Sequence, residues 1–568
     1  MTTVGAWTIG LALTYTLFLV GAGRVAKRRE SAGRDFFAGG RRFRPITVAF
    51  CITGLFSGSS FIAILELSYH TGVSALWYGV AESVQILLIA GLLVVPLRER
   101  MVVTISGLIG ERFGRLALGV GGAITAFTFP MWSVATAIAF ASALHAFTGL
   151  SIQVAIVGTA LLLLFYLWSG GMWSIAFTQT ANCVVFTLML ALGATAFLID
   201  PGVGGLRELA ASRPEMLDWS GVGLPLVVAW FGTFVVNVIL AQAALQMALS
   251  CRTPEAGRRG LVYAVGFGVP FILLGVVCGL AAALVVPGEA LGLVGVPLYI
   301  AQVLPAPLAA VFFLGIWACA LGWGGPCQFS GATSLGRDVG RALRPGATEE
   351  DMVRYTRWSL VLLTALMIAF GFLRAEQSAW WNVLAWTLRN GATLAPVLAA
   401  LFWPLATRRA VVAAMIVGFG TGLAWYQLGG WQPDQFHLGV HPVWVGMSVN
   451  LLVMVVVTLL ESRGEWALPL VGERRHLRGL GTVTAAVAVG LITLIAWDWL
   501  QAHGLGGLTG FATVALASAA AFQLITPRPT TSLPADSHPG SGPGRHPGDD
   551  EEAVGRARPV SGGVPAGP

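Results

Sequence analysis

Charged residues are scarce in this chain, and their scarcity excludes a soluble protein. Asp, Glu, Lys and Arg make up 11% of the 568 residues, whereas soluble domains carry roughly 25%. Apolar residues make up 56%, and they gather in runs of about 20 residues, which is the length that crosses a bilayer as a helix. These runs do not alternate apolar and polar residues, which excludes an outer-membrane barrel. The composition therefore predicts an all-α polytopic membrane protein with the lipid bilayer as its surroundings.

Cysteine is also rare, and the basic residues are widely spread. The six cysteines show no CxxC or Cys/His spacing, so we predict no disulfide, no metal site and no cofactor. Acidic, basic and metal-binding residues form no cluster of the kind that an enzyme needs, so no enzyme is predicted. The net charge of +7 comes from residues in the short gaps between apolar runs. That placement is typical of topology signals rather than of nucleic-acid binding.

About fifteen apolar spans are predicted to cross the membrane. They cover residues 5–23, 45–70, 76–97, 117–148, 151–169, 173–199, 223–250, 260–288, 304–330, 358–373, 380–403, 410–430, 441–460, 479–497 and 507–526. With the N-terminus outside, most Arg and Lys residues fall in cytoplasmic gaps, and the opposite gaps hold only Arg207, Arg213 and Arg374. Because such a bias sets orientation, we expect a cell (inner or plasma) membrane protein with its C-terminus in the cytoplasm.

Three charged residues lie well inside these spans: Glu66, Glu82 and Arg389. A charge at the bilayer centre costs at least ~2.5–3.5 kcal/mol, so such residues usually serve a function. All three are expected at similar depth from the outer side. The pattern favours a transporter and indicates where its working parts lie.

Six segments in order share a resemblance that covers residues 35–425. They are RDFFAGGRRFRP with the Gly/Ser-rich span up to HTGVSALWYG, TISGLIGERFGR, YLWSGGMWSIAFTQTAN, AQAALQMALSCRTPEAGRRG, ATSLGRD and LFWPLATRRAVVAAMIVGFGTGLAW. Together these segments resemble the sodium:solute symporter family. The resemblance implies a leucine-transporter-type fold with two inverted five-helix repeats, made of spans two to six and seven to eleven, and with additional flanking helices. It also implies a secondary active transporter that moves a small organic solute by alternating access.

The resemblance divides the chain into four parts. Residues 1–44 form an N-terminal helix and cytoplasmic loop, and residues 45–403 form the symporter-like core. Residues 404–526 add C-terminal membrane helices. Residues 527–568 are rich in Pro, Gly, Ser and charge, which predicts a disordered cytoplasmic tail.

The resemblance places sodium between the second and ninth spans, yet the matching positions are poor in oxygen. Backbone carbonyls of Thr53 and Phe56 match the family pattern, but the paired serines of the ninth span are replaced by Gly322 and Trp323. The acidic residue usual in the sixth span is Gln179. Hard cations prefer oxygen ligands, so the sodium site is expected to be degraded. Either Na⁺ or H⁺ remains open as the coupling ion.

The solute is expected at mid-membrane, between a broken second span and a broken seventh span. By resemblance, its side of the second span carries Ser57, Ser59, Ser60 and Phe61, and the inner-gate position of the seventh span is Val238. Arg389 is a further candidate, because a guanidinium matches the carboxylate of an anionic solute.

Several roles stay open for the three membrane charges. Glu66 and Arg389 could pair as an external gate, Glu66 or Glu82 could exchange a coupling proton, or a static buried pair could fix helix contacts. A second function is also open, a transporter-shaped receptor that binds solute without net transport and signals through a separate partner chain.

Overall fold

The computed structural model describes residues 2–27, 34–99, 103–168, 171–375, 377–432, 435–469 and 473–528. Apart from its first two residues, the predicted tail 527–568 lies outside this described part of the chain.

Helices make up almost all of the described chain. The first group is α1 (Thr3–Lys27), α2 (Arg34–Ala38), η1 (Gly39–Arg41), α3 (Pro45–Leu55), η2 (Phe56–Phe61), α4 (Ile62–Thr71), η3 (Gly72–Ala75), α5 (Leu76–Leu88), η4 (Ile89–Leu93), α6 (Val94–Glu99), α7 (Ile105–Phe113), α8 (Arg115–Thr148), α9 (Ile152–Trp168) and α10 (Met172–Ile199). The second group is α11 (Gly202–Ser212), η5 (Pro214–Leu217), α12 (Leu224–Asn237), α13 (Gln242–Leu249), α14 (Pro254–Val285), α15 (Gly292–Val303), α16 (Ala306–Cys319), η6 (Ala320–Gly324), α17 (Gly325–Thr333), η7 (Ser334–Val339), α18 (Gly340–Leu343), α19 (Glu349–Leu373) and α20 (Ser378–Phe402). The third group is α21 (Arg408–Leu428), η8 (His437–Gly439), α22 (Pro442–Glu461), α23 (Arg474–Ile495), α24 (Trp497–Ala502) and α25 (Gly506–Leu524), with a short antiparallel pair of strands, β1 (Trp466–Ala467) and β2 (Thr526–Pro527).

Each predicted span coincides with a helix or with an interrupted series of helices, which confirms the all-α polytopic class. Within the described residues, 11 helices are long and apolar enough to cross a membrane, or 12 if the bent pair α12 and α13 counts as one span. The number falls below fifteen for three reasons. Residues 45–99 run as one continuous helical stretch, α9 has only 17 residues, and α20 carries Arg389 among several polar residues.

Two irregular helices open the two five-helix groups. The seventh span bends by 42° between α12 and α13, as expected of a broken helix. The second span, in contrast, does not unwind. It widens into the π-helix η2 and continues as α4, so the carbonyl of Thr53 still accepts the amide of Phe56. The expected break is therefore corrected to a π-helical segment, a feature that is frequent at functional sites.

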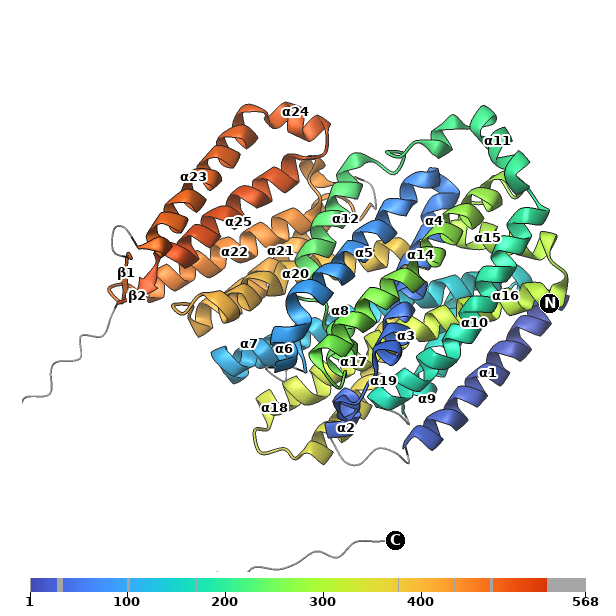
Figure 1. Cartoon of the computed structure of the whole chain (residues 1–568), viewed down its shortest axis with the longest axis horizontal. Coiled ribbons are helices and arrows are strands. Elements are labelled where there is room, and N and C mark those ends of the chain that lie inside the picture. Colours follow the sequence, from blue (N-terminus) through green and yellow to red (C-terminus); the bar gives the residue numbers. More distant parts are fainter. Residues whose placement is uncertain are drawn as a thin grey trace, which may run out of the picture. The chain divides into compact units, whose positions relative to one another are not determined.

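The helices run between two ends of the bundle. α11 and α24 lie at one end, and α2, α7 and α18 lie at the other (Figure 1). By the predicted topology, the first is the outer end and the second is the cytoplasmic end. α23 packs against α25, and α22 joins both α25 and the helices α20 and α21 of the main bundle. This arrangement leaves α5, α8, α12, α13 and α20 around the middle of the core.

Candidate solute pathway and central site

A small cavity lies in the middle of the core and has a volume of about 20 Å³. This is room for about one water molecule. The cavity is lined by Leu55, Glu82, Gln85, Phe129, Trp132, Asn237, Ala241, Ala243, Ala244, Trp323, Trp386 and Arg389. Its walls therefore come from both irregular helices, from α5 and η6, and from the long helices α8 and α20. In this conformation the centre is closed around a space too small for an organic solute.

Glu82 and Arg389 bring opposite charges to this cavity. Glu82 on α5 is fully buried and accepts a hydrogen bond from the hydroxyl of Ser60 in η2. Arg389 on α20 donates to the side-chain oxygen of Asn237, and its guanidinium carbon lies 4.5 Å from the ring centre of Trp132. Among the described residues, no ion pair within 4.0 Å joins Glu82 to Arg389. Both groups thus line the cavity without neutralising each other directly.

A wide vestibule opens at the predicted outer end, with a volume of about 760 Å³. Trp230 lines the vestibule and Trp386 lines the central cavity. An aromatic cluster joins them, because the ring of Tyr78 lies 5.4 Å from Trp230 and from Phe234, and Phe234 lies 4.4 Å from Trp386. These four rings, the aromatic lid, separate the vestibule from the centre.

Glu66 lies in the vestibule wall and binds the beginning of α20. Its two carboxylate oxygens accept the backbone amides of Ser378, at 3.0 Å, and of Ala379, at 2.8 Å. Arg389 lies eleven residues further along α20, which corresponds to about 16 Å of helix rise. Glu66 therefore does not lie at the same depth as Arg389, contrary to the expectation for the three charges. Among the described residues, Glu66 and Arg389 also form no ion pair, so the structure does not contain the expected external gate pair. Glu66 acts as a cap on a helix that the chain sequence alone does not place beside it.

Hydrogen bonds close the centre toward the predicted cytoplasmic end. Gln242, the first residue of α13, accepts the amide of Ile105 at 3.0 Å and donates to the carbonyl of Ser330 and the hydroxyl of Ser334, at 3.2 and 2.8 Å. One turn later, Gln246 accepts from the hydroxyl of Ser330 at 2.8 Å. We refer to Gln242, Gln246, Ser330, Ser334 and the Ile105 amide as the inner latch. It ties α13, the second half of the bent span, to α7, α17 and η7.

The three predicted serines of the second span do not line the cavity. The hydroxyl of Ser57 donates to a backbone carbonyl of its own helix at 3.1 Å. Ser59 lies 3.3 Å from the hydroxyl of Tyr78, and Ser60 contacts Glu82. Ser59 and Ser60 therefore support the site through two side chains of α5, one in the aromatic lid and one in the cavity wall.

Of the other predicted solute-side residues, Arg389 lines the cavity and two do not. Phe61 packs away from the centre, with its ring 5.8 Å from that of Phe271 on α14. Val238 is buried in the bend after α12, and its neighbour Asn237 reaches the cavity instead.

Sequence reasoning missed nine of the twelve wall residues, and four of these nine carry hydrogen-bonding side chains: Gln85, Trp132, Asn237 and Trp386. A usable signal existed for Asn237, which is a lone amide in a strongly apolar run just before the bend. The two tryptophans gave no such signal, because tryptophan is common throughout this chain.

Comparison with known proteins decides the family. The model of the sodium:solute symporter family matches residues 36–418. The chain belongs to the sodium:solute symporter family. Over 467 residues it is 22% identical to a sodium/pantothenate symporter of Escherichia coli (strain K12), which covers 78% of this chain and 94% of that relative. It is also 27% identical over 283 residues to a sodium/iodide cotransporter of Homo sapiens, a match that spans 46% of this chain but only 42% of that protein.

A solved structure shares the fold of this chain. It is a Na⁺-coupled sialic acid symporter in a substrate-bound outward-open state, with a TM-score of 0.63, 16% sequence identity and coverage of 80% of this chain and 98% of that one. The leucine-transporter-type fold and its two repeats are thereby confirmed, and the family match confirms a multi-pass membrane protein of a solute symporter family.

The positions that the resemblance assigns to a sodium site come together in space, and they offer few side-chain oxygens. α3 and η2 both pack against η6, which brings the segment with Thr53 and Phe56 beside Gly322 and Trp323. The hydroxyl of Thr53 is used within its own helix, donating to a carbonyl at 2.8 Å. Gly322 has no side chain, and the indole of Trp323 lines the central cavity.

Gln179 occupies the gap between these two helices. Its side-chain amide nitrogen donates to the carbonyl of Gly322 and, at 3.3 Å, to the carbonyl of Cys51. Its oxygen accepts from Asn182 at 3.2 Å, and Asn182 in turn accepts from the hydroxyl of Tyr15 on α1. A neutral N–H donor thus links the carbonyls of the second and ninth spans, as a bound cation would do.

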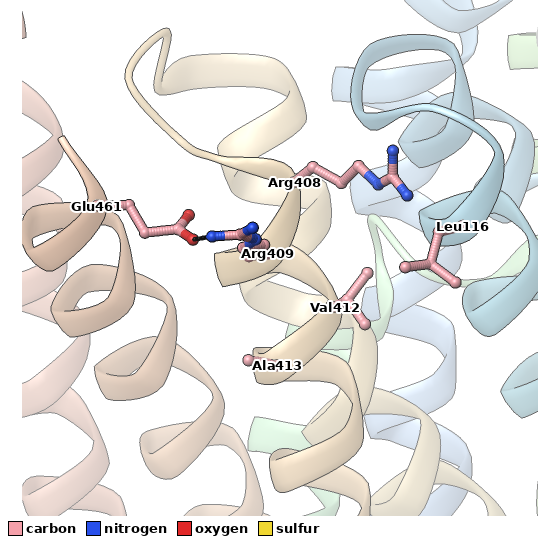
Figure 2. A pocket seen from close by; sticks show the side chains of 6 residues that line it. All are labelled: Leu116, Arg408, Arg409, Val412, Ala413 and Glu461. Atoms are coloured by element: carbon pink, nitrogen blue, oxygen red, sulfur yellow. Dashed lines mark hydrogen bonds and ion pairs between the residues drawn. The ribbon is translucent and has the colours of Figure 1, made fainter.

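A second large pocket, of about 800 Å³, lies at the opposite end from the vestibule. Figure 2 shows its side chains, with Arg409 directed toward Glu461 of α22 and Arg408 extending toward the side of Leu116. The Arg409–Glu461 pair spans 3.4 Å, and the arginine side chain is 88% exposed. Such surface pairs contribute roughly 0–1 kcal/mol. None of its lining residues is shared with the central cavity.

Proposed function

We propose that this protein is a secondary active transporter that moves a small organic solute across the membrane by alternating access. One observation carries the proposal. A nearly closed cavity with buried charges lies between a vestibule at one end and a hydrogen-bonded latch at the other. Burying charged groups costs free energy. A cavity with room for one water does not compensate that cost, whereas a larger polar solute that enters when the walls separate would.

The two barriers differ in chemistry, which supports separate opening. The aromatic lid is apolar and is held by ring contacts between α5, α12 and α20. The inner latch is polar and is held by amides and hydroxyls. Water replaces hydrogen bonds easily but does not replace ring packing. We propose that the latch releases when α13 moves, and that the lid opens when α12 and α20 separate.

We further propose that sodium is not bound at the family's usual position. Support comes from Gln179, whose amide nitrogen donates to the carbonyls of Cys51 and Gly322 in the gap where the resemblance places the ion, and from the lack of side-chain oxygens at Gly322 and Trp323. An N–H group in this gap carries a partial positive charge, which disfavours a cation beside it.

We also propose that residues 45–403 form the transport core and that residues 404–526 are supporting helices. The N-terminus lies outside in this proposal.

The sodium proposal is tested on the purified protein without knowledge of the solute. Thermal unfolding is compared in NaCl and in KCl at equal ionic strength. An ion present at 100 times its Kd stabilises the bound state by about 2.7 kcal/mol, which is readily measured. We expect no difference between the two salts, and a sodium-specific stabilisation would contradict the proposal.

Transport itself is tested in proteoliposomes with sodium and proton gradients imposed separately. The first labelled probes are pantothenate, proline and a mixture of amino acids. Uptake above that of protein-free liposomes supports the transporter. Saturable binding by the purified protein without any uptake would favour the receptor that signals through a partner.

A further inference from the structure

The central cavity is surrounded by hydrogen-bonding atoms that have no partner within the described chain. Three are donors: the Nε of Arg389 and the indole nitrogens of Trp132 and Trp323. One is an acceptor, the Oε1 of Glu82. All four side chains line the cavity, and none is more than 5% exposed.

Such an inventory is unusual, because buried polar atoms in folded proteins nearly always find partners. Each unpaired buried atom lowers stability, and a charged one does so more strongly. Four unpaired atoms on one cavity are explained if a guest supplies the missing partners. The guest then needs acceptor oxygens for three donors and a hydrogen-bond donor for one carboxylate oxygen.

We propose that the solute of this transporter is a small zwitterion that carries a carboxylate and an ammonium group. Its carboxylate binds the guanidinium of Arg389 and the indole N–H groups of Trp132 and Trp323. Its ammonium group binds Glu82. This inference rests on the proposed function, and it adds to that function the chemical class of the cargo.

Other solute classes match the site less well. A simple anion satisfies the three donors but leaves the carboxyl of Glu82 without a partner. A simple amine satisfies Glu82 and adds a positive charge near Arg389. A neutral sugar offers hydroxyls but leaves both charges of the site uncompensated. Only a guest with both charges pairs each one, and Glu82 with Arg389 keeps the whole complex neutral.

Binding is measured on the purified full chain by its tryptophan fluorescence, because Trp132, Trp323 and Trp386 line the cavity. The probes are the proteinogenic amino acids. Each amino acid that binds is compared with its deaminated acid and with its decarboxylated amine. Sites built to pair polar groups reject analogues that lack one of them by large factors. We expect the matched acid and the matched amine each to bind at least about 100-fold more weakly.

Variants assign each charge to its partner. Glu82→Gln is expected to abolish the preference for the amino acid over its matched acid, and Arg389→Gln to abolish the preference over the matched amine. Trp323→Phe removes one N–H and is expected to weaken binding about tenfold. Glu208→Gln, at an exposed glutamate of α11, is the control and leaves binding unchanged. If the Glu82 or Arg389 variant fails to fold, the comparison of matched ligands on the unaltered protein still decides.

Three results distinguish a failure of the zwitterion proposal from a failure of the proposed transport function. If no amino acid binds, or if a matched acid binds as tightly as its amino acid, the zwitterion is refuted. If proteoliposomes nevertheless take up that acid, the transport function is supported although the zwitterion proposal is refuted. If an amino acid binds with the expected preference but is never taken up, the zwitterion site stands and the proposed transport function falls.

Discussion

Gln242 offers the sharpest test of the inner latch. Its side chain makes three buried hydrogen bonds across the interface, at 3.0, 3.2 and 2.8 Å. A typical buried hydrogen bond contributes about 1 kcal/mol net, so Gln242→Ala removes about 3 kcal/mol from the closed form. In the open form water takes the place of these partners, and that form loses little. The substitution therefore shifts the balance toward opening at the cytoplasmic end by about 100-fold, at 1.4 kcal/mol per factor of ten.

The assay uses a single cysteine at Ala244, in a background whose own cysteines are replaced by alanine. Ala244 lines the central cavity and is 2% exposed, so a cysteine there reacts only when the latch opens. A membrane-impermeant maleimide is added to the predicted cytoplasmic face of inside-out vesicles. Gln242→Ala is expected to raise the labelling rate up to about 100-fold. Gln242→Glu keeps an acceptor for the Ile105 amide but loses both donated bonds, and an intermediate rate is expected.

The control variant is Gln435→Ala, at an exposed loop position, and it is expected to leave the labelling rate unchanged. Full labelling in denaturant shows that the cysteine is present and reactive in every variant. A rate in Gln242→Ala equal to that of the parent would refute the latch, because three lost hydrogen bonds then have no influence on opening.

Three further substitutions test the packing around the pathway. Glu66→Ala removes both hydrogen-bond acceptors at the start of α20 and is expected to destabilise the protein by about 2 kcal/mol. The loss is measured as a lower thermal unfolding temperature. An unchanged temperature would mean that water in the vestibule caps the helix equally well. Asn450→Ala removes three hydrogen bonds that join α22 to α20 and α21, at 2.7, 3.0 and 2.8 Å, and is expected to cost about 3 kcal/mol, with equal stability as the contrary finding. A β-carbon at Gly418 would meet the backbone carbonyl of Gly391, whereas one at Gly420 would meet nothing within 4 Å. Gly418→Ala is therefore expected to reduce the yield of folded protein and Gly420→Ala to leave it unchanged, and equal yields in size-exclusion chromatography would contradict this close helix crossing.

The sequence was sufficient to predict the membrane class, the order of the helices and the family. Apolar runs of membrane length need only local composition, and family segments keep their order along the chain, so both are visible without coordinates. The resemblance indicated that the positions expected to bind sodium lack oxygen ligands, and the rarity of charge within the apolar spans singled out Glu82 and Arg389. It failed where distant segments meet. Glu66 looked like a partner for Arg389 because both lay a similar distance into their spans.

Only the tertiary structure decided what these groups contact. It placed Glu66 against the first amides of α20, since a helix beginning leaves unpaired N–H groups that a nearby carboxylate accepts. It brought Glu82 and Arg389 to one cavity with two indole N–H groups that have no partner among the described residues, and it placed the amide of Gln179 between the carbonyls of Cys51 and Gly322. Which side chains meet across two helices depends on how each helix is rotated about its axis and how deep it lies in the membrane. The order of residues along the chain does not specify either quantity.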